Sequence, residues 1–425
     1  MVTHLYGILG VILDRTFGNI IRMLRIIRLP KEERGHLSWT FVGTLAVILA
    51  YGLIMMFSAS YSSGYTNHGG NIYYFIKPQA IVAAVGFVVM LGVSLINYRA
   101  LRYMFWTFYV ITLALLVLAL FMPSDNNGCY RWVYLPGGMS LQPSELAKFA
   151  VILGTADILD HHQREIKSLF QCVFKPACLL IPILVLLKLE PHNSAMLLMA
   201  MIFATMLVCA GAGGVKLWAV AVPAGAAVLV YFIKSLASGD GYASERLGGV
   251  WGLTPTNTAG MQWQTLQSIY AICTGGLFGV GIGNSVQKHQ WLPYAENDFI
   301  FAVIGEELGF VGALALIALF AALLVQGVCI ALRAPDLYGT LLGIGIISQV
   351  GWQVFLHIGV GTALLPNTGI SLPFFSSGGT SLLLLLGEMG VMLSISRAGN
   401  AREKRLADQH RAETERMLQH SRYRK

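Results

Sequence analysis

The 425-residue sequence has little charge and few cysteines. Only 12% of its residues are charged, whereas 56% are hydrophobic and the mean hydropathy is +0.64. Soluble domains usually carry about 25% charged residues, so this composition excludes an ordinary soluble domain and is typical of a polytopic membrane protein. The six cysteines are scattered without CxxC spacing, so neither a disulfide framework nor a zinc site is supported.

Several motifs of soluble enzymes are also missing. The chain has no P-loop, no GxGxxG between a strand and a helix, no HExxH and no DxD motif. Nucleotide chemistry and a dedicated metal cage therefore have no sequence support, and we predict no metal site.

Uncharged runs of about 20 residues are abundant, and each is long enough to cross a bilayer. With three weaker segments they predict an all-α polytopic membrane protein of about ten transmembrane helices. The clear runs are 38–58, 79–98, 103–122, 217–233, 310–330, 340–362 and 379–395, and the weaker ones are 141–160, 175–189 and 194–210.

The formal net charge of +8 is distributed unevenly. Ten spans put both termini on one side, and 21 of the 29 Lys and Arg residues then fall on that side. By the positive-inside rule, both termini are cytoplasmic. The basic tails are therefore interpreted as topology signals that contact lipid headgroups, and no nucleic-acid partner is predicted.

Three regions follow from this topology. Residues 1–36 form a basic amphipathic segment at the cytoplasmic surface, 37–396 the membrane domain and 397–425 a basic cytoplasmic tail. A large extracytoplasmic loop, 234–298, joins helices 7 and 8, and its length favours a function. Within it, the apolar, Gly-rich stretch 267–283 is too short to span and is interpreted as re-entrant or interfacial.

A few ionisable residues in this apolar chain are candidates for chemistry. Glu145 and Lys148 lie three residues apart on one helical face, as a buried ion pair or as substrate-binding groups. Arg131 could bind a phosphate or diphosphate, or form a salt bridge stacked on Trp132. Lys288 is a second outward cation.

The stretch YAENDFIFAVIGEELG, 294–309, contains four carboxylates. Asp298 lies at the predicted outer boundary of a helix, as a general base or as a helix N-cap. Glu306 and Glu307 lie about 12–13 Å deeper and must be paired or protonated, with Lys148 as a candidate partner. For Glu296 we predict a solvated flank.

Three long segments resemble one family. The chain reads NNGCYRWVYLPGGMSLQPSELAK at 126–148, QWQTLQSIYAICTGGLFGVGIGNSVQKHQWLPYAENDFIFAVIGEELGFVG at 262–312 and LLPNTGISLPFFSSGGTSLLLLLGEMGVMLSISR at 364–397. These segments resemble the SEDS family of FtsW/RodA/SpoVE-type peptidoglycan glycosyltransferases. The resemblance is closer to the division and sporulation branch than to the rod-elongation branch.

The resemblance implies a ten-helix enzyme of the bacterial cytoplasmic membrane that polymerises lipid II on the outer face. It forms β-1,4 bonds and releases undecaprenyl diphosphate. The implied partners are a class B penicillin-binding protein transpeptidase and other membrane proteins of the division complex. No cofactor is established by the resemblance, and a role for a divalent cation stays open.

The resemblance also implies roles for individual residues. The essential aspartate of the family's DFIFA motif corresponds to Asp298, the catalytic residue. Substrate-binding roles carry over to seven residues, namely Arg131, Glu145, Lys148, Gln264, Gln267, Ser268 and Lys288. Glu306 and Glu307 are expected to have supporting structural roles.

The sequence departs from the family pattern at two places. EPHNSA stands where many members have a QPDLGT-like motif, so His192 occupies the acidic position and Ser194 replaces a glycine. SSGGTS replaces the commoner SYGGSS. Roles of the family's aspartate and tyrosine at these places cannot be carried over.

Two other functions stay open from the sequence. The chain could be a flippase for a lipid-linked precursor, in which case intramembrane Glu145, Lys148, Glu306 and Glu307 would matter more than Asp298. It could also be a non-catalytic scaffold of the division machinery.

Overall fold

The structure, a computed structural model, describes residues 30, 33–123, 130–134, 140–163, 170–211 and 261–423. It is built almost entirely of helices, with one two-stranded antiparallel ribbon and a π-helical turn, Phe170–Phe174. The helices are α2 (Trp39–Asn67), α3 (Ile76–Val93), α4 (Ala100–Ala119), α5 (Pro143–His161), α6 (Lys175–Leu189), α7 (Asn193–Cys209), α10 (Met261–Gly275), α11 (Ile300–Leu332), α12 (Leu337–Gly361) and α13 (Gly379–Tyr423), and the strands are β1 (Val133–Tyr134) and β2 (Ser140–Leu141).

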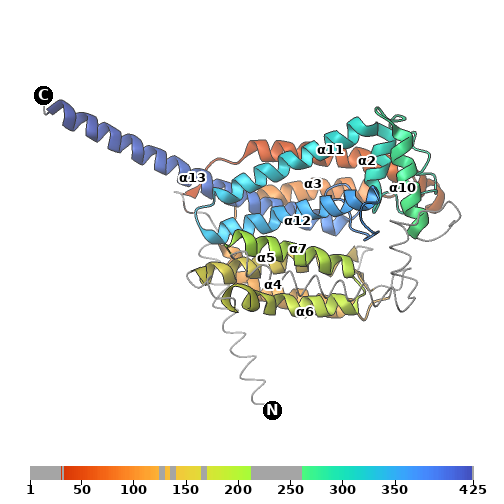
Figure 1. Ribbon diagram of the computed structural model, residues 1–425, viewed down its shortest axis with the longest axis horizontal. Helices are drawn as coiled ribbons and strands as arrows, with labels where there is room; N and C mark the ends of the chain where they lie inside the picture. The colour runs from red at the N-terminus through yellow and green to blue at the C-terminus, as the bar shows by residue number, and fades with distance from the viewer. Residues whose placement is uncertain are drawn as a thin grey trace, which may run out of the picture.

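The long helices lie alongside one another in one bundle, with α12 at its centre (Figure 1). Of the most apolar stretch of α12, 72% is buried, against 22% for each of α3, α4 and α11. A helix that contacts protein on all sides buries most of its surface, whereas a lipid-facing helix exposes apolar side chains. The outer helices therefore present the surface expected to face lipid.

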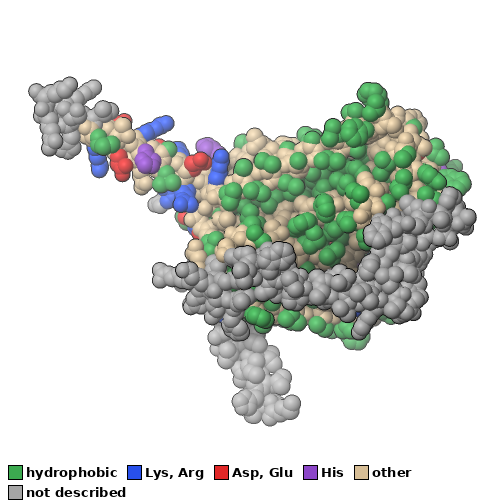
Figure 2. Space-filling model, viewed as in Figure 1, with side chains coloured by type: hydrophobic (Ala, Val, Ile, Leu, Met, Phe, Trp, Pro, Cys, Tyr) green, Lys and Arg blue, Asp and Glu red, His purple; other side chains and the backbone are tan. Residues whose placement is uncertain are grey.

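The prediction of a polytopic helical membrane protein is confirmed. Among the described residues, seven helices are long and apolar enough to cross a membrane, and α7 is a shorter apolar helix. Nine of the ten predicted spans coincide with a helix, and the tenth, 217–233, lies outside the described residues. The visible face of the body is covered by hydrophobic side chains, whereas Lys, Arg, Asp and Glu gather on the projecting part of α13 (Figure 2).

The predicted regions at the chain ends are only partly described. Residues 1–29, 31 and 32 lie outside the described part, as does the section 234–260 of the predicted extracytoplasmic loop. Helix α13 continues without a break through residue 397, so the membrane domain and the predicted tail share one helix.

The predicted re-entrant stretch packs against a break in α11. After α10 ends, Val280 N–H donates to the Glu306 carbonyl at 3.0 Å, and Phe310 N–H donates to the Gly276 carbonyl at 2.9 Å. These bonds satisfy backbone groups that the break at Gly309, with φ of 66°, leaves without helical partners. The break is therefore fixed by the 276–281 segment and sets the positions of Glu306 and Glu307.

Candidate functional site

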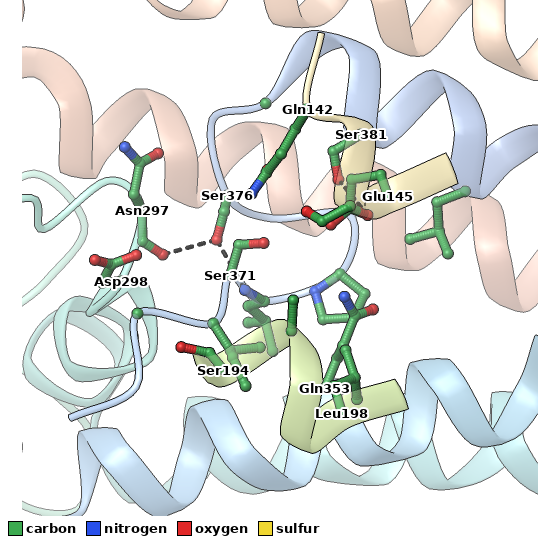
Figure 3. A pocket seen from close by; sticks show the side chains of 18 of the residues that line it. Gln142, Glu145, Ser194, Leu198, Asn297, Asp298, Gln353, Ser371, Ser376 and Ser381 are labelled. Carbon is green, nitrogen blue, oxygen red and sulfur yellow. Dashed lines mark hydrogen bonds between the residues drawn. The ribbon is translucent and has the colours of Figure 1, made fainter. Parts of the chain in front are cut away.

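A polar cavity of about 170 Å³ opens at one end of the bundle. Its walls come from the segments before α5 and α11, the turn before α7, the loop 369–378, and parts of helices α5, α7, α12 and α13 (Figure 3). Its charged and strongly polar lining residues are Arg131, Gln142, Ser144, Glu145, Lys148, His192, Ser194, Asn297, Asp298, Gln353, Ser371, Ser376, Ser377 and Ser381.

Asp298 is half-buried in the wall of this cavity. Helix α11 has Phe299 as its N-cap and no side-chain cap, so the N-cap interpretation of Asp298 is wrong. No other described residue forms a hydrogen bond with its carboxylate. Burial raises the pKa of Asp298 to about 6, and the charge of Arg131 opposes this effect. The carboxylate is thus a proton acceptor that is mostly ionised at neutral pH and is available to a ligand.

The loop around Asp298 is held by hydrogen bonds from several elements. Ser376 Oγ donates to the Asn297 carbonyl at 2.7 Å and accepts from Leu372 N–H at 2.9 Å. Ser194 Oγ donates to the Thr368 carbonyl, which joins the turn before α7 to the same loop. The position of Asp298 is therefore fixed by α7 and by the loop before α13.

Glu145 and Lys148 form the predicted ion pair. Lys148 Nζ lies 2.8 Å from Glu145 Oε2, and Ser381 Oγ donates to the same oxygen at 3.2 Å. Figure 3 shows Glu145 and Asp298 approaching the cavity from opposite sides. Arg131 lines the cavity as well. The structure thus brings four predicted site residues, Asp298, Arg131, Glu145 and Lys148, to one cavity.

The other predicted substrate-binding residues lie elsewhere. Gln264, Gln267, Ser268 and Lys288 are not among the described residues that line the cavity. Gln264 Oε1 accepts from Asn367 Nδ2 at 3.0 Å, and Ser268 Oγ donates to the Gly361 carbonyl at 2.7 Å. These two bonds hold helix α10 against the end of α12 and the loop that follows it, which passes close to Asp298.

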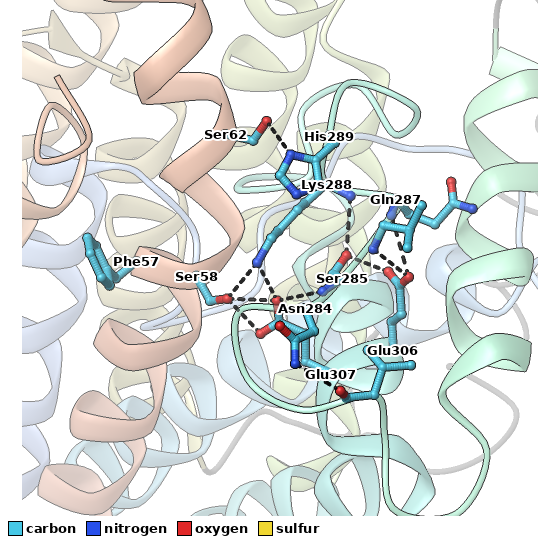
Figure 4. Close-up of polar contacts among 12 residues, drawn as sticks. Phe57, Ser58, Ser62, Asn284, Ser285, Gln287, Lys288, His289, Glu306 and Glu307 are labelled. Carbon is cyan, nitrogen blue, oxygen red and sulfur yellow. Dashed lines mark hydrogen bonds and ion pairs between the residues drawn. The ribbon is translucent and has the colours of Figure 1, made fainter. Parts of the chain in front are cut away.

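Lys288 belongs to a second buried group, which we call the Lys288 cluster: Ser58, Ser285, Lys288, Glu306 and Glu307 (Figure 4). Lys288 Nζ lies 2.7 Å from Glu307 Oε1, and Ser58 Oγ also donates to the Glu307 carboxylate. Glu307 is paired, as expected of a buried carboxylate, but the prediction of Lys148 as the partner of Glu306 or Glu307 is wrong: Lys148 pairs with Glu145, and the loop after α10 brings Lys288 to Glu307 and Ser285 to Glu306. The cluster holds that loop against α2 and the break in α11.

Sequence reasoning gave no role to two buried groups beside the cavity. Glu190 is 0% exposed, and burial raises its pKa to about 8. His192 lines the cavity, and burial together with the charges of Arg131 and Lys148 lowers its pKa to about 3. The unusual EPHNS stretch was the sequence signal that could have pointed to Glu190 and His192.

The expectation of a solvated Glu296 is wrong, because this residue is only 7% exposed.

Comparison with known sequences places this architecture in a family. The sequence model FTSW_RODA_SPOVE, described as cell cycle protein, matches residues 38–401. Stage V sporulation protein E of Bacillus subtilis is 38% identical over 356 residues, covering 83% of this chain and 94% of that protein. A probable peptidoglycan glycosyltransferase FtsW of Geobacter metallireducens is 36% identical over 364 residues, covering 83% and 92%.

Solved structures show the same fold. A chain of a peptidoglycan synthase complex, studied for the coordination of polymerization and crosslinking, aligns with a TM-score of 0.71 and 25% identity over 85% of this chain and 98% of that one. The rod shape determining protein RodA of Thermus thermophilus aligns with a TM-score of 0.61 and 25% identity, covering 85% and 97%. The chain therefore belongs to the FtsW/RodA/SpoVE family.

Proposed function

We propose that this protein is a peptidoglycan glycosyltransferase that polymerises lipid II at the outer face of the cytoplasmic membrane, in cell division or sporulation. The observation that supports this most strongly is the cavity itself: it combines one ligand-accessible carboxylate of raised pKa, Asp298, with the cations Arg131 and Lys148. Relatives of matching length are named probable peptidoglycan glycosyltransferase FtsW.

Asp298 is the general base of the proposed reaction. It accepts the proton of the acceptor sugar's 4-hydroxyl as that oxygen attacks the anomeric carbon of the donor. The bond between the anomeric carbon and the diphosphate oxygen breaks, and the electron pair leaves with undecaprenyl diphosphate. Attack from the side opposite the leaving group inverts the anomeric centre and produces the β-1,4 bond.

Arg131 and Lys148 stabilise the departing diphosphate. Both line the cavity, where low exposure strengthens their interaction with a developing negative charge. Glu145 holds the Lys148 ammonium at 2.8 Å and so fixes its direction. The described residues hold no group of three His, Cys, Asp or Glu side chains suited to a metal ion. A divalent cation would enter with the substrate's diphosphate.

The proposed partner is a class B penicillin-binding protein that crosslinks the new strand. The support is the similarity to a chain of a peptidoglycan synthase complex. The proposed outer-face position of the cavity depends on the excess of Lys and Arg at the two termini, which favours a cytoplasmic location for both.

The test is polymerisation of fluorescent lipid II by the purified full-length protein in lipid nanodiscs, with glycan products separated on a gel. The wild type should produce a ladder with its partner, and Asp298→Ala should fold but produce none. A parallel translocation assay in proteoliposomes distinguishes a flippase, which would move lipid II without polymerising it. A scaffold would support growth equally well with Asp298→Ala.

A further inference from the structure

The turn between α6 and α7 places an unusual histidine in the cavity wall. His192 is 6% exposed, and its Nδ1 atom is buried and has no hydrogen-bond partner among the described residues. A buried polar atom without a partner costs about 1–3 kcal/mol, so a native protein rarely leaves one unpaired without a reason. Because His192 lines a ligand-sized cavity, a bound ligand can supply the missing partner.

The position of His192 is fixed relative to Asp298. Its N–H donates to the Leu187 carbonyl at 2.9 Å, which anchors the turn to the end of α6. Two residues later, Ser194 donates to the Thr368 carbonyl, next to Gly369. Gly369 in turn closely approaches Asp298: a Cβ atom on it would lie 3.7 Å from Asp298 Oδ2. A ligand group bound to His192 is therefore held at a set place beside the general base.

The charges around His192 determine what it can bind. The cavity also presents Arg131, Lys148, Glu145 and Asp298, and the two cations disfavour a third positive charge. With its pKa lowered to about 3, the imidazole is neutral at physiological pH. A neutral imidazole offers one donor and one acceptor, which suits a hydroxyl or amide group, whereas a diphosphate is better matched by guanidinium and ammonium groups.

We propose that His192 forms a sugar subsite that binds a hydroxyl or acetamido group of the substrate's hexosamine, while Arg131 binds the diphosphate. The proposal rests on the proposed function and divides the cavity into a neutral part and a cationic part. His192 is a binding residue that orients the sugar and takes no proton in the reaction.

The test compares two ligands that share the undecaprenyl diphosphate, of which only one carries the disaccharide with its attached peptide. Binding of lipid II and of undecaprenyl diphosphate to the full-length protein in nanodiscs is measured by native mass spectrometry. His192→Ala should weaken lipid II binding about five- to tenfold, as expected for one lost hydrogen bond. It should leave undecaprenyl diphosphate binding unchanged, whereas Arg131→Gln should weaken binding of both ligands.

Conservative variants separate binding from folding. An Asn amide occupies the place of Nδ1 and a Gln amide the place of Nε2, so recovery of lipid II affinity by His192→Asn alone identifies Nδ1 as the binding atom. Unchanged lipid II affinity in His192→Ala, or an equal loss for both ligands, would overturn the sugar subsite. Sugar-dependent binding by a wild type that forms no glycan would support the subsite and reject only the polymerase function.

Discussion

The Asp298 cavity and the Lys288 cluster use the same residue types for different purposes. Each combines carboxylates, a lysine and serines in a buried setting. In the cluster, both Glu306 and Glu307 accept hydrogen bonds at both carboxylate oxygens. In the cavity, neither the Asp298 carboxylate nor His192 Nδ1 has a hydrogen-bond partner in the part of the chain that the structure describes.

The difference shows which buried charges serve the fold and which are available to a ligand. In a paired cluster each charged group already has a protein partner, and breaking the pair leaves an isolated charge in a low-dielectric environment. An unpaired group beside a cavity costs stability in the free protein and gains a partner when a ligand binds. The comparison can be tested by disturbing each region in turn.

The largest expected effect is on the stability of the Lys288 cluster. Glu307→Leu leaves Lys288 buried without its partner and should destabilise the fold by about 3–5 kcal/mol. The double variant Lys288→Met/Glu307→Leu removes both charges and should unfold close to the wild-type temperature. Thermal unfolding in detergent measures both. A single variant as stable as the double would show that the pair does not hold the loop after α10.

The next effect concerns the pH dependence of catalysis. The general base works in its ionised form, and the pKa of Asp298 is about 6. Activity should therefore reach a plateau above pH 6 and fall about tenfold per pH unit below it. Initial rates of lipid II polymerisation between pH 5 and 8 measure this, with unfolding temperatures checked at each pH. A flat profile in a stable protein would contradict Asp298 as the base.

A smaller effect is expected at the loop that positions Asp298. Ser376→Ala removes the bond to the Asn297 carbonyl and leaves Leu372 N–H unpaired. It should cost about 1–3 kcal/mol of stability and lower the polymerisation rate severalfold. Ser377→Ala is the matched control for stability, since the Ser377 side chain forms no hydrogen bond with another described residue and its N–H bond to the Glu296 carbonyl is kept. Equal unfolding temperatures for the two variants would contradict the anchoring role of Ser376.

The smallest expected effect is a gain in folding stability rather than a loss. The pKa of Asp298 is raised on folding, so its ionised form destabilises the folded protein once the pH rises through about 6. At pH 7.5, Asp298→Asn should stabilise the fold by about 1 kcal/mol, a value reduced because the carboxylate reaches solvent. Thermal unfolding at pH 4 and pH 7.5 should show the gain only at the higher pH. A loss at pH 7.5 would place Asp298 among the structural carboxylates.

Hydropathy predicted most of the fold, because each membrane span is a run of apolar residues that can be identified without knowing its neighbours in space. The pairing of Glu145 with Lys148 was also predictable, since it depends on helical spacing within α5. The partner of Glu307 was not, because it depends on a loop that folds back 19 residues and on Ser58, 249 residues away in sequence. Tertiary contacts of this kind leave no periodic pattern.

The sequence also left two interpretations of Asp298 open. The N-cap interpretation placed the start of α11 one residue too early, and helix boundaries are the least certain part of such a prediction. Glu296 was expected to be solvated because it lies in a polar loop. Its side chain is instead buried and forms a hydrogen bond with Ser63 of α2, while Ser377 N–H donates to its backbone carbonyl at 3.4 Å.

The most direct test of the central claim compares the two regions in one assay. Initial rates of lipid II polymerisation are measured for the wild type, Asp298→Asn and Lys288→Met/Glu307→Leu, each in nanodiscs with a class B penicillin-binding protein. We predict a loss of about 10²- to 10⁴-fold for Asp298→Asn, with its fold intact, and a nearly wild-type rate for the double variant. Wild-type polymerisation by Asp298→Asn, or complete loss of activity in a folded double variant, would contradict the account.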